Sequence, residues 1–155
     1  MTLDKKDFVN DFKVEGDWVA DMHAMHAKYG VPEALAKLDD EKLKKFLKFR
    51  IDFLQEELDE LKATLEEDYK NPGSRADDAV DAMIDLVVIS IGTLDLFQVD
   101  AYEAWARVYE ANLNKEVGIK PSRPQGGDMP DLIKKPGWKA PTHADNVGLL
   151  SRVFK

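Results

Sequence analysis

Cysteine is absent from the 155-residue chain, which excludes disulfide bonds and thiolate metal sites. No apolar run reaches the roughly 20 residues that a membrane-spanning helix needs, so no membrane partner is expected. The opening stretch MTLDKKDF is polar and lacks the apolar region of a signal peptide, which predicts a cytoplasmic protein. P-loop, GxGxxG, GxSxG and zinc-binding patterns are also missing.

Net negative charge is concentrated in the first 117 residues, which carry a formal charge of −12. The formal net charge is −8, which argues against affinity for nucleic acid. Residues 118–155 nevertheless carry seven Lys or Arg against three Asp. An acidic body with a cationic tail suits a metal-bound polyphosphate better than a DNA groove.

The length is sufficient for one domain with its own core. We expect an all-α body over residues 1–117 and a Pro/Gly-rich basic tail over residues 118–155. Five Gly and five Pro in the tail predict extended chain. Trp138 indicates that the tail docks on the body or on a neighbouring subunit; the alternative is a disordered cationic terminus.

Apolar periodicity predicts helices separated by clear breaks. The long central pattern has so broad an apolar surface that it must pack on more than one neighbour. We therefore expect an oligomeric helical bundle of about four to five helices. The expected helices run from Asp17 to Tyr29, from Asp39 or Asp40 to about Tyr69, from about Asp77 to Phe97, and onward from Asp100, where Glu103 completes a capping box.

The central helix contains an acidic cluster within the stretch FRIDFLQEELDEL. Glu56, Glu57 and Glu60 fall within about a third of the helix circumference. Like charges at this spacing weaken a helix by a few tenths of a kcal/mol per pair. The cluster is either a solvated acidic face or a site for a cation.

The following helix is apolar almost all round and is expected to be buried. Asp81 and Asp85 nevertheless lie four residues apart on one of its faces. A buried carboxylate must be protonated, paired or bound to a metal, because burying it alone costs several kcal/mol. Asp78, close to the same line, is interpreted as an amino-terminal cap.

A short connection allows these two helices to form an antiparallel hairpin in which the five carboxylates converge. Ligation by oxygen alone favours Mg²⁺ or Mn²⁺. The Glu-x-x-His motifs of a di-iron site are absent. Carboxylate-held Mg²⁺ most often serves phosphoryl chemistry, over which the cationic tail could close as a lid.

Two further groups of residues are open to two interpretations. His23 and His26 are either partly buried histidines or face a ligand's base or phosphate. Asn112 and Lys115 could reach a phosphate, although a Lys at the end of a helix is also ordinary dipole chemistry.

The acidic stretch, then DDAVDAMIDLVVISIGTLDLFQVD, then WARVYEANLNK resembles the MazG-like, phosphoribosyl-ATP-pyrophosphohydrolase-like group of the all-α NTP pyrophosphohydrolases. HAKYG, residues 26–30, is similar to the family's His-x-Lys-aromatic-Gly segment. PDLIKKPGW, residues 130–138, is similar to the tail of related, often phage-encoded, members. The resemblance covers roughly residues 17–141.

This resemblance implies a dimeric or tetrameric helical enzyme that uses Mg²⁺ to cleave a nucleoside triphosphate between its α- and β-phosphates. It also implies a role for each matching residue. The expected metal ligands are Glu56, Glu57, Glu60, Asp81 and Asp85, with Glu56 and Glu57 also catalytic. The expected substrate-binding residues are His26, Lys28, Asn112, Lys115, Lys134 and Trp138.

One position departs from the family pattern. The Glu of the ExxD motif falls at Ala82, so Asp81 would have to substitute from a position about 100° round the helix. The alternatives are a phosphoribosyl-ATP or ppGpp hydrolase and, in another class, a non-catalytic helical interaction module.

Overall fold

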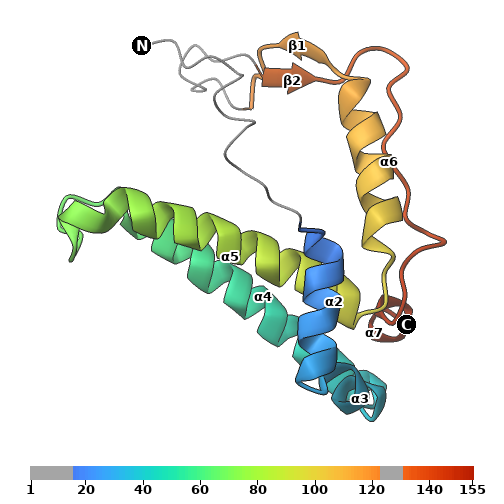
Figure 1. The fold of residues 1–155 in the computed structure, drawn as a ribbon. Coiled ribbons are helices and arrows are strands. Elements are labelled where there is room, and N and C mark those ends of the chain that lie inside the picture. Colours follow the sequence, from blue (N-terminus) through green and yellow to red (C-terminus); the bar gives the residue numbers. More distant parts are fainter. Residues whose placement is uncertain (1–15, 123–130) are drawn as a thin grey trace.

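The computed structural model describes residues 16–122 and 131–155 and is mostly helical, with 63% of these described residues in helix (Figure 1). The predicted all-α fold is confirmed, although the described part holds six α-helices rather than four or five. No helix in it is long and apolar enough to cross a membrane. The elements are α2 (Trp18–Lys28), α3 (Val31–Ala36), α4 (Asp40–Ala63), a 3₁₀ turn (Pro72–Ser74), α5 (Arg75–Leu96), α6 (Ala101–Leu113), β1 (Glu116–Gly118), β2 (Asp131–Ile133) and α7 (Leu150–Val153).

A long antiparallel hairpin of α4 and α5 is the centre of the fold, and α2 crosses α5 near the end opposite the turn (Figure 1). Leu43 and Phe97 are fully buried at that end. Leu35, Leu96, Val99 and Val153 complete the same cluster. The core therefore lies at one end of the hairpin, and the turn between α4 and α5 projects away from it.

Aspartates begin three of the helices, as expected for residues that accept bonds from free helical N–H groups. The carboxylates of Asp17, Asp39 and Asp100 accept from backbone N–H groups two or three residues ahead, at 2.8–3.2 Å. The second half of the predicted capping box does not form. Glu103 instead binds Arg107 at 2.9 Å, and the Asp100 N–H donates to Asn146.

The prediction that the central helix continues to Tyr69 is wrong, because α4 ends at Ala63. The Thr64 hydroxyl donates back to the Leu61 carbonyl at 2.7 Å. The Arg75 guanidinium then donates to the Thr64 and Glu67 carbonyls at 2.8 and 3.3 Å. These bonds satisfy carbonyls at the helix end and fold residues 64–70 into a turn.

The expectation that α5 is buried all round is only partly met. Ala82, Ile89 and Gly92 are buried, but Val80 and Met83 are 57% and 48% exposed. One face of α5 thus packs inside the chain, whereas the other carries apolar side chains into solvent.

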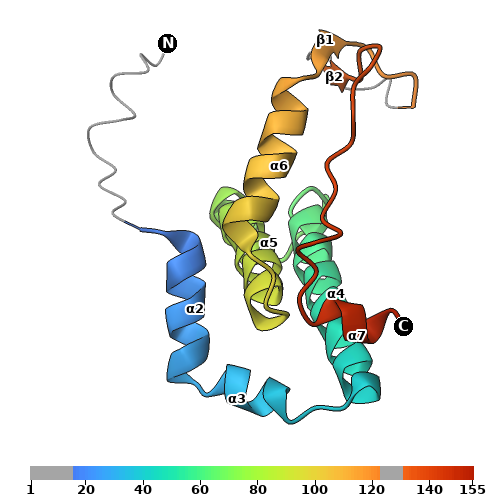
Figure 2. The same cartoon turned by 90° about the vertical axis from the view of Figure 1, so that its right-hand side faces the viewer.

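The tail is more structured than expected. Helix α6 rises away from the hairpin and leads into the antiparallel β1–β2 pair (Figure 2). The chain then returns along α6 to α7, whose Val153 is buried against the base of the hairpin. Gly148 makes this return possible, since it has φ +50° and a Cβ there would lie 2.1 Å from the Phe97 carbonyl oxygen.

Candidate active site

The expected metal ligands lie on the two arms of the hairpin. Glu56, Glu57 and Glu60 occupy the last third of α4, and Asp81 and Asp85 occupy the first half of α5. Because the arms run antiparallel and pack side by side, these segments face one another. Glu57 and Asp85 are half-buried, and the other three carboxylates are exposed.

The electrostatics of Glu57 show that the five carboxylates share one region. Burial raises the pKa of Glu57 first, and the negative charges of Glu60, Asp85, Glu56 and Asp81 raise it further. An ionised Glu57 is therefore disfavoured unless a cation is near.

The basic side chains that the structure describes do not neutralise this layer. Within residues 16–122 and 131–155, no Lys or Arg forms an ion pair with any of the five carboxylates. Lys48 is 2.7 Å from Asp52, and Lys62 is 3.3 Å from Asp59. Arg50 donates to the Thr93 hydroxyl at 2.9 Å and to the Ile89 carbonyl at 3.1 Å.

Such a donor set fits a hard divalent cation, which prefers carboxylate oxygens. In the described part of the chain, no three His, Asp or Glu side chains close tightly enough to surround an ion. The carboxylates thus form a charged layer and not a finished coordination sphere.

A pocket of about 430 Å³ adjoins the layer at the turn of the hairpin, and Glu60 and Asp81 line it. Asp78 also lines it, but the interpretation of Asp78 as a cap is wrong, because Ser74 precedes the helix. The Asp78 carboxylate accepts from the Ser74 and Tyr69 hydroxyls at 2.5 and 2.7 Å. These bonds lower the pKa of Asp78 and join its carboxylate to the turn of the hairpin.

The histidines lie elsewhere. His23 and His26 each place Nδ1 against one oxygen of Asp95, at 2.8 and 2.7 Å, and His26 is buried. Asp95 is ten residues beyond Asp85, or about 15 Å along α5. Lys28 stacks on the Tyr29 ring at 5.3 Å and is exposed. The structure does not bring this group to the carboxylates.

The remaining expected substrate contacts gather at the far end of α6 (Figure 1). Trp138 donates through Nε1 to the Ala111 carbonyl of α6 at 2.6 Å, so this part of the tail contacts α6 within one chain. The ammonium groups of Lys115 and Lys134 lie 5.5 and 4.7 Å from the centre of the Trp138 ring. Asn112 is exposed nearby.

Two structural features of the site were missed in the sequence. Arg75 ties the turn of the hairpin together, and Asp95 binds both histidines. The only signal for either was a charged residue at a helix end or within an apolar pattern, and such a residue does not identify its partner.

Comparison with known proteins gives one family. The family model described as phosphoribosyl-ATP pyrophosphohydrolase matches residues 31–112, which is more than half of the chain and includes all five carboxylates. A search of curated proteins gives no match. The chain therefore belongs to the phosphoribosyl-ATP pyrophosphohydrolase family.

Proposed function

We propose that the protein is a Mg²⁺-dependent nucleoside triphosphate pyrophosphohydrolase that releases a nucleoside monophosphate and pyrophosphate. The observation that carries the proposal is the layer of five carboxylates around Glu57, which form no ion pair with any described residue and lie on the segment that the family model matches. Mg²⁺, with Mn²⁺ as a substitute, would neutralise phosphate oxygens and stabilise the charge that develops on them.

Glu57, Glu60 and Asp85 are the residues that would hold the metal, since they come from both helices. Glu56 or Asp81 would orient the attacking water and accept its proton. The water oxygen forms a bond to the α-phosphorus. The bond from the α-phosphorus to the oxygen that bridges the α- and β-phosphates breaks. That oxygen leaves with pyrophosphate.

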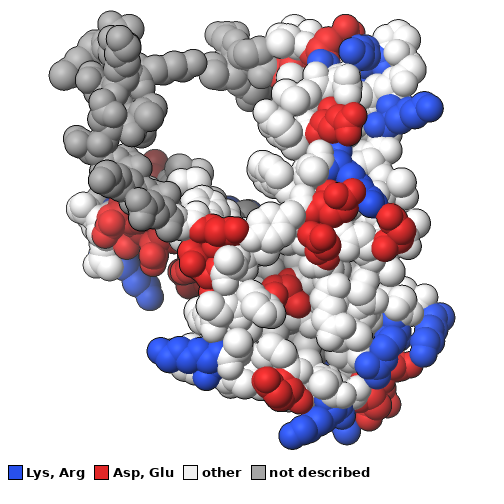
Figure 3. Space-filling view, turned by 45° about the vertical axis from the view of Figure 1, so that its right-hand side comes forward, with Lys and Arg blue, Asp and Glu red and all other residues white. Residues whose placement is uncertain are grey.

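In this proposal, a second copy of the chain completes the site. In one chain the cations around Trp138 lie at the far end of α6, away from the carboxylates (Figure 1). Apolar side chains are exposed on α6, with Trp105 71% and Tyr109 54% accessible. Figure 3 shows broad uncharged areas on one face of the molecule. A homodimer or homotetramer would cover such surface and bring cationic residues to the carboxylates of a neighbour.

The family description favours a second candidate, phosphoribosyl-ATP as the specific substrate. The same carboxylates would serve it, because the bond broken is again a phosphoanhydride. An alarmone such as ppGpp is a further substrate to include in the test. A non-catalytic helical module would leave the Glu57 layer without a role.

Product analysis tests the proposal. The protein is incubated with Mg²⁺ and each (d)NTP, phosphoribosyl-ATP or ppGpp, and pyrophosphate is separated from phosphate. Pyrophosphate with monophosphate is expected from the preferred triphosphate. Release of phosphate with diphosphate would show a different reaction, and no product from any nucleotide would favour the interaction module.

A pair of variants tests the site itself. Glu60→Gln should abolish hydrolysis while the helical circular dichroism is unchanged. Asp59→Asn is the matched control, because Asp59 is the adjacent exposed acid and binds only Gln55 and Lys62 among the described side chains. Normal turnover by Glu60→Gln would refute the assignment of the metal ligands.

A further inference from the structure

The carboxylate layer lies between two arginines that bind across the hairpin. Arg50 on α4 donates to the Ile89 carbonyl of α5 at 3.1 Å. Arg75 on α5 donates to the Thr64 carbonyl, at the end of α4, at 2.8 Å. Each arginine thus ties its own helix to the backbone of the other.

The two ties have the same spacing in the sequence. Glu56 comes six residues after Arg50, and Asp81 comes six residues after Arg75. The accepting carbonyls lie four residues beyond the last acid of each arm, at Thr64 after Glu60 and at Ile89 after Asp85. At about 1.5 Å per residue, each tie is therefore about 6–9 Å from the carboxylates on either arm.

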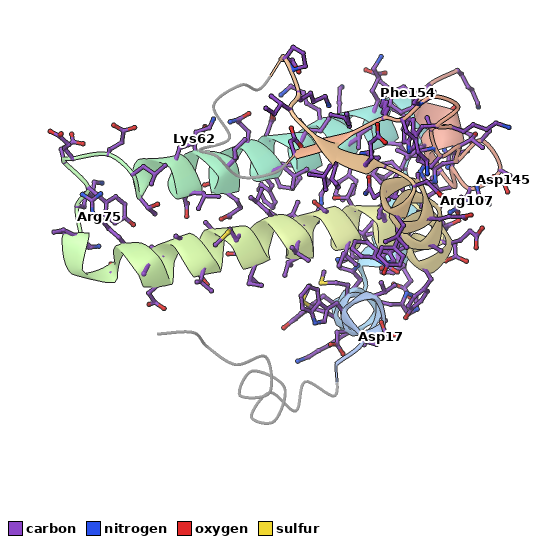
Figure 4. The ribbon with its side chains drawn as sticks, turned by 90° about the horizontal axis from the view of Figure 1, so that it is seen from above. Asp17, Lys62, Arg75, Arg107, Asp145 and Phe154 are labelled. Atoms are coloured by element: carbon purple, nitrogen blue, oxygen red, sulfur yellow. The ribbon has the colours of Figure 1, made fainter. Side chains whose placement is uncertain are left out.

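Each arginine is occupied by neutral groups. Arg50 also donates to the Thr93 hydroxyl and lies 5.9 Å from the Phe53 ring centre. Arg75 also donates to the Glu67 carbonyl and lies 5.4 Å from the Tyr69 ring centre. Figure 4 shows Arg75 at the turn of the hairpin.

These ties oppose a specific force. Like charges on facing helices repel, and no basic side chain in the described part of the chain neutralises them. The repulsion acts in the half of the hairpin nearer the turn, whereas the main cluster of buried residues lies at the other end.

We propose that Arg50 and Arg75 are positioning residues, whose reciprocal bonds keep α4 and α5 side by side so that carboxylates from both helices can close on a divalent cation. This inference rests on the proposed function for the role of the cation. It concerns the two arginines as a pair, and each acts through the carboxylates and touches no reacting atom.

Mn²⁺ titration of the full-length protein by calorimetry tests it. Arg75→Met should weaken Mn²⁺ binding about tenfold, since a charge-assisted tie between the arms is lost. Lys62→Met is the matched control, because Lys62 is an exposed cation two residues from Glu60. Loss of positive charge alone should slightly tighten binding in both variants. Equal or tighter binding by Arg75→Met would overturn the proposal.

Hydrogen exchange of the metal-free protein gives a second measurement that does not depend on metal binding. Arg75→Met should speed exchange in residues 54–61, and adding Glu57→Gln should restore protection by reducing the repulsion. A failure of that second substitution to restore protection would contradict the proposal. If Arg75→Met did not fold, Arg75→Lys is the second variant. Its lysine can reach one carbonyl instead of two, so exchange in residues 54–61 should be faster than in the wild type.

The outcomes separate the two proposals. A wild-type protein that binds no Mn²⁺ and hydrolyses no nucleotide would refute the proposed function. The exchange rates of the metal-free variants would still decide whether the arginines hold the arms together against the repulsion.

Discussion

Replacing Glu57 by Gln should change the stability of the protein in opposite directions with and without Mg²⁺. In the metal-free protein, burial and four neighbouring carboxylates disfavour the ionised side chain and raise its pKa. A raised pKa means that folding loses stability as the pH rises through the titration of Glu57. At pH 7 the substitution removes this unfavourable charge, so it should stabilise the metal-free state.

The size of both effects follows from the geometry. Glu57 meets like charges on its own helix and across the hairpin, each pair costing a few tenths of a kcal/mol, so the relief is about 0.5–1 kcal/mol. For a chain of this length, that raises Tm by about 1–3 °C. Mg²⁺ at 100 times its Kd stabilises the wild type by about 2.7 kcal/mol, or about 5–10 °C. The variant should lose most of that gain.

Differential scanning calorimetry in EDTA and in saturating Mg²⁺ measures both the relief of repulsion and the stabilisation by Mg²⁺. Glu57→Gln should melt above the wild type in EDTA and below it in Mg²⁺. The control is Asp59→Asn, which removes an exposed acid from the same helix and should leave the Mg²⁺ shift unchanged. A variant that is destabilised in EDTA, or that keeps the full Mg²⁺ shift, would refute the reasoning.

Three further predictions concern the tail. Gly148→Ala should destabilise the protein by about 2–4 kcal/mol in urea unfolding, because φ is +50° and the new Cβ would meet the Phe97 carbonyl; an unchanged midpoint would contradict the close approach. Arg107 lowers the pKa of Asp145 to about 2, so this pair contributes stability above about pH 4 that is lost as the pH falls toward 2; Asp145→Asn should flatten the acid limb of Tm against pH. Trp138→Phe removes the 2.6 Å bond to α6 but keeps a ring under the cations, and should cost about 1–2 kcal/mol in the same urea assay; no loss would mean that packing alone holds the tail.

Local signals in the sequence were sufficient for the starts of the helices and the order of the acidic motifs. An Asp cap depends on the N–H groups two or three residues ahead, so the sequence placed the helix starts at Asp17, at Asp39 or Asp40, and at Asp100, and the structure has caps at Asp17, Asp39 and Asp100. The short connection between two long helices was sufficient to predict that the two acidic segments face one another. These features need no knowledge of distant partners.

The features that were missed all depend on distant partners. The early end of α4 requires Arg75, which lies more than ten residues beyond it. The short helix α7 is stable because Arg152 binds Asp40 at 2.7 Å, 112 residues away in the sequence. Periodicity within a window cannot report such contacts, and a Pro/Gly-rich composition favours extended chain.

Three aspartates on one face of α5 show where a sequence pattern stops being sufficient. Asp78, Asp81 and Asp85 have the same chemistry, yet the hydroxyls of Tyr69 and Ser74 take up the first of them. The other two have no cationic partner in the described part of the chain and act on Glu57. A carboxylate that already accepts two strong hydrogen bonds is stabilised little further by a metal ion, whereas a carboxylate without a cationic partner is stabilised much more. The partners of each aspartate, and not its place in the motif, therefore make Asp81 and Asp85 the better candidates for metal ligation.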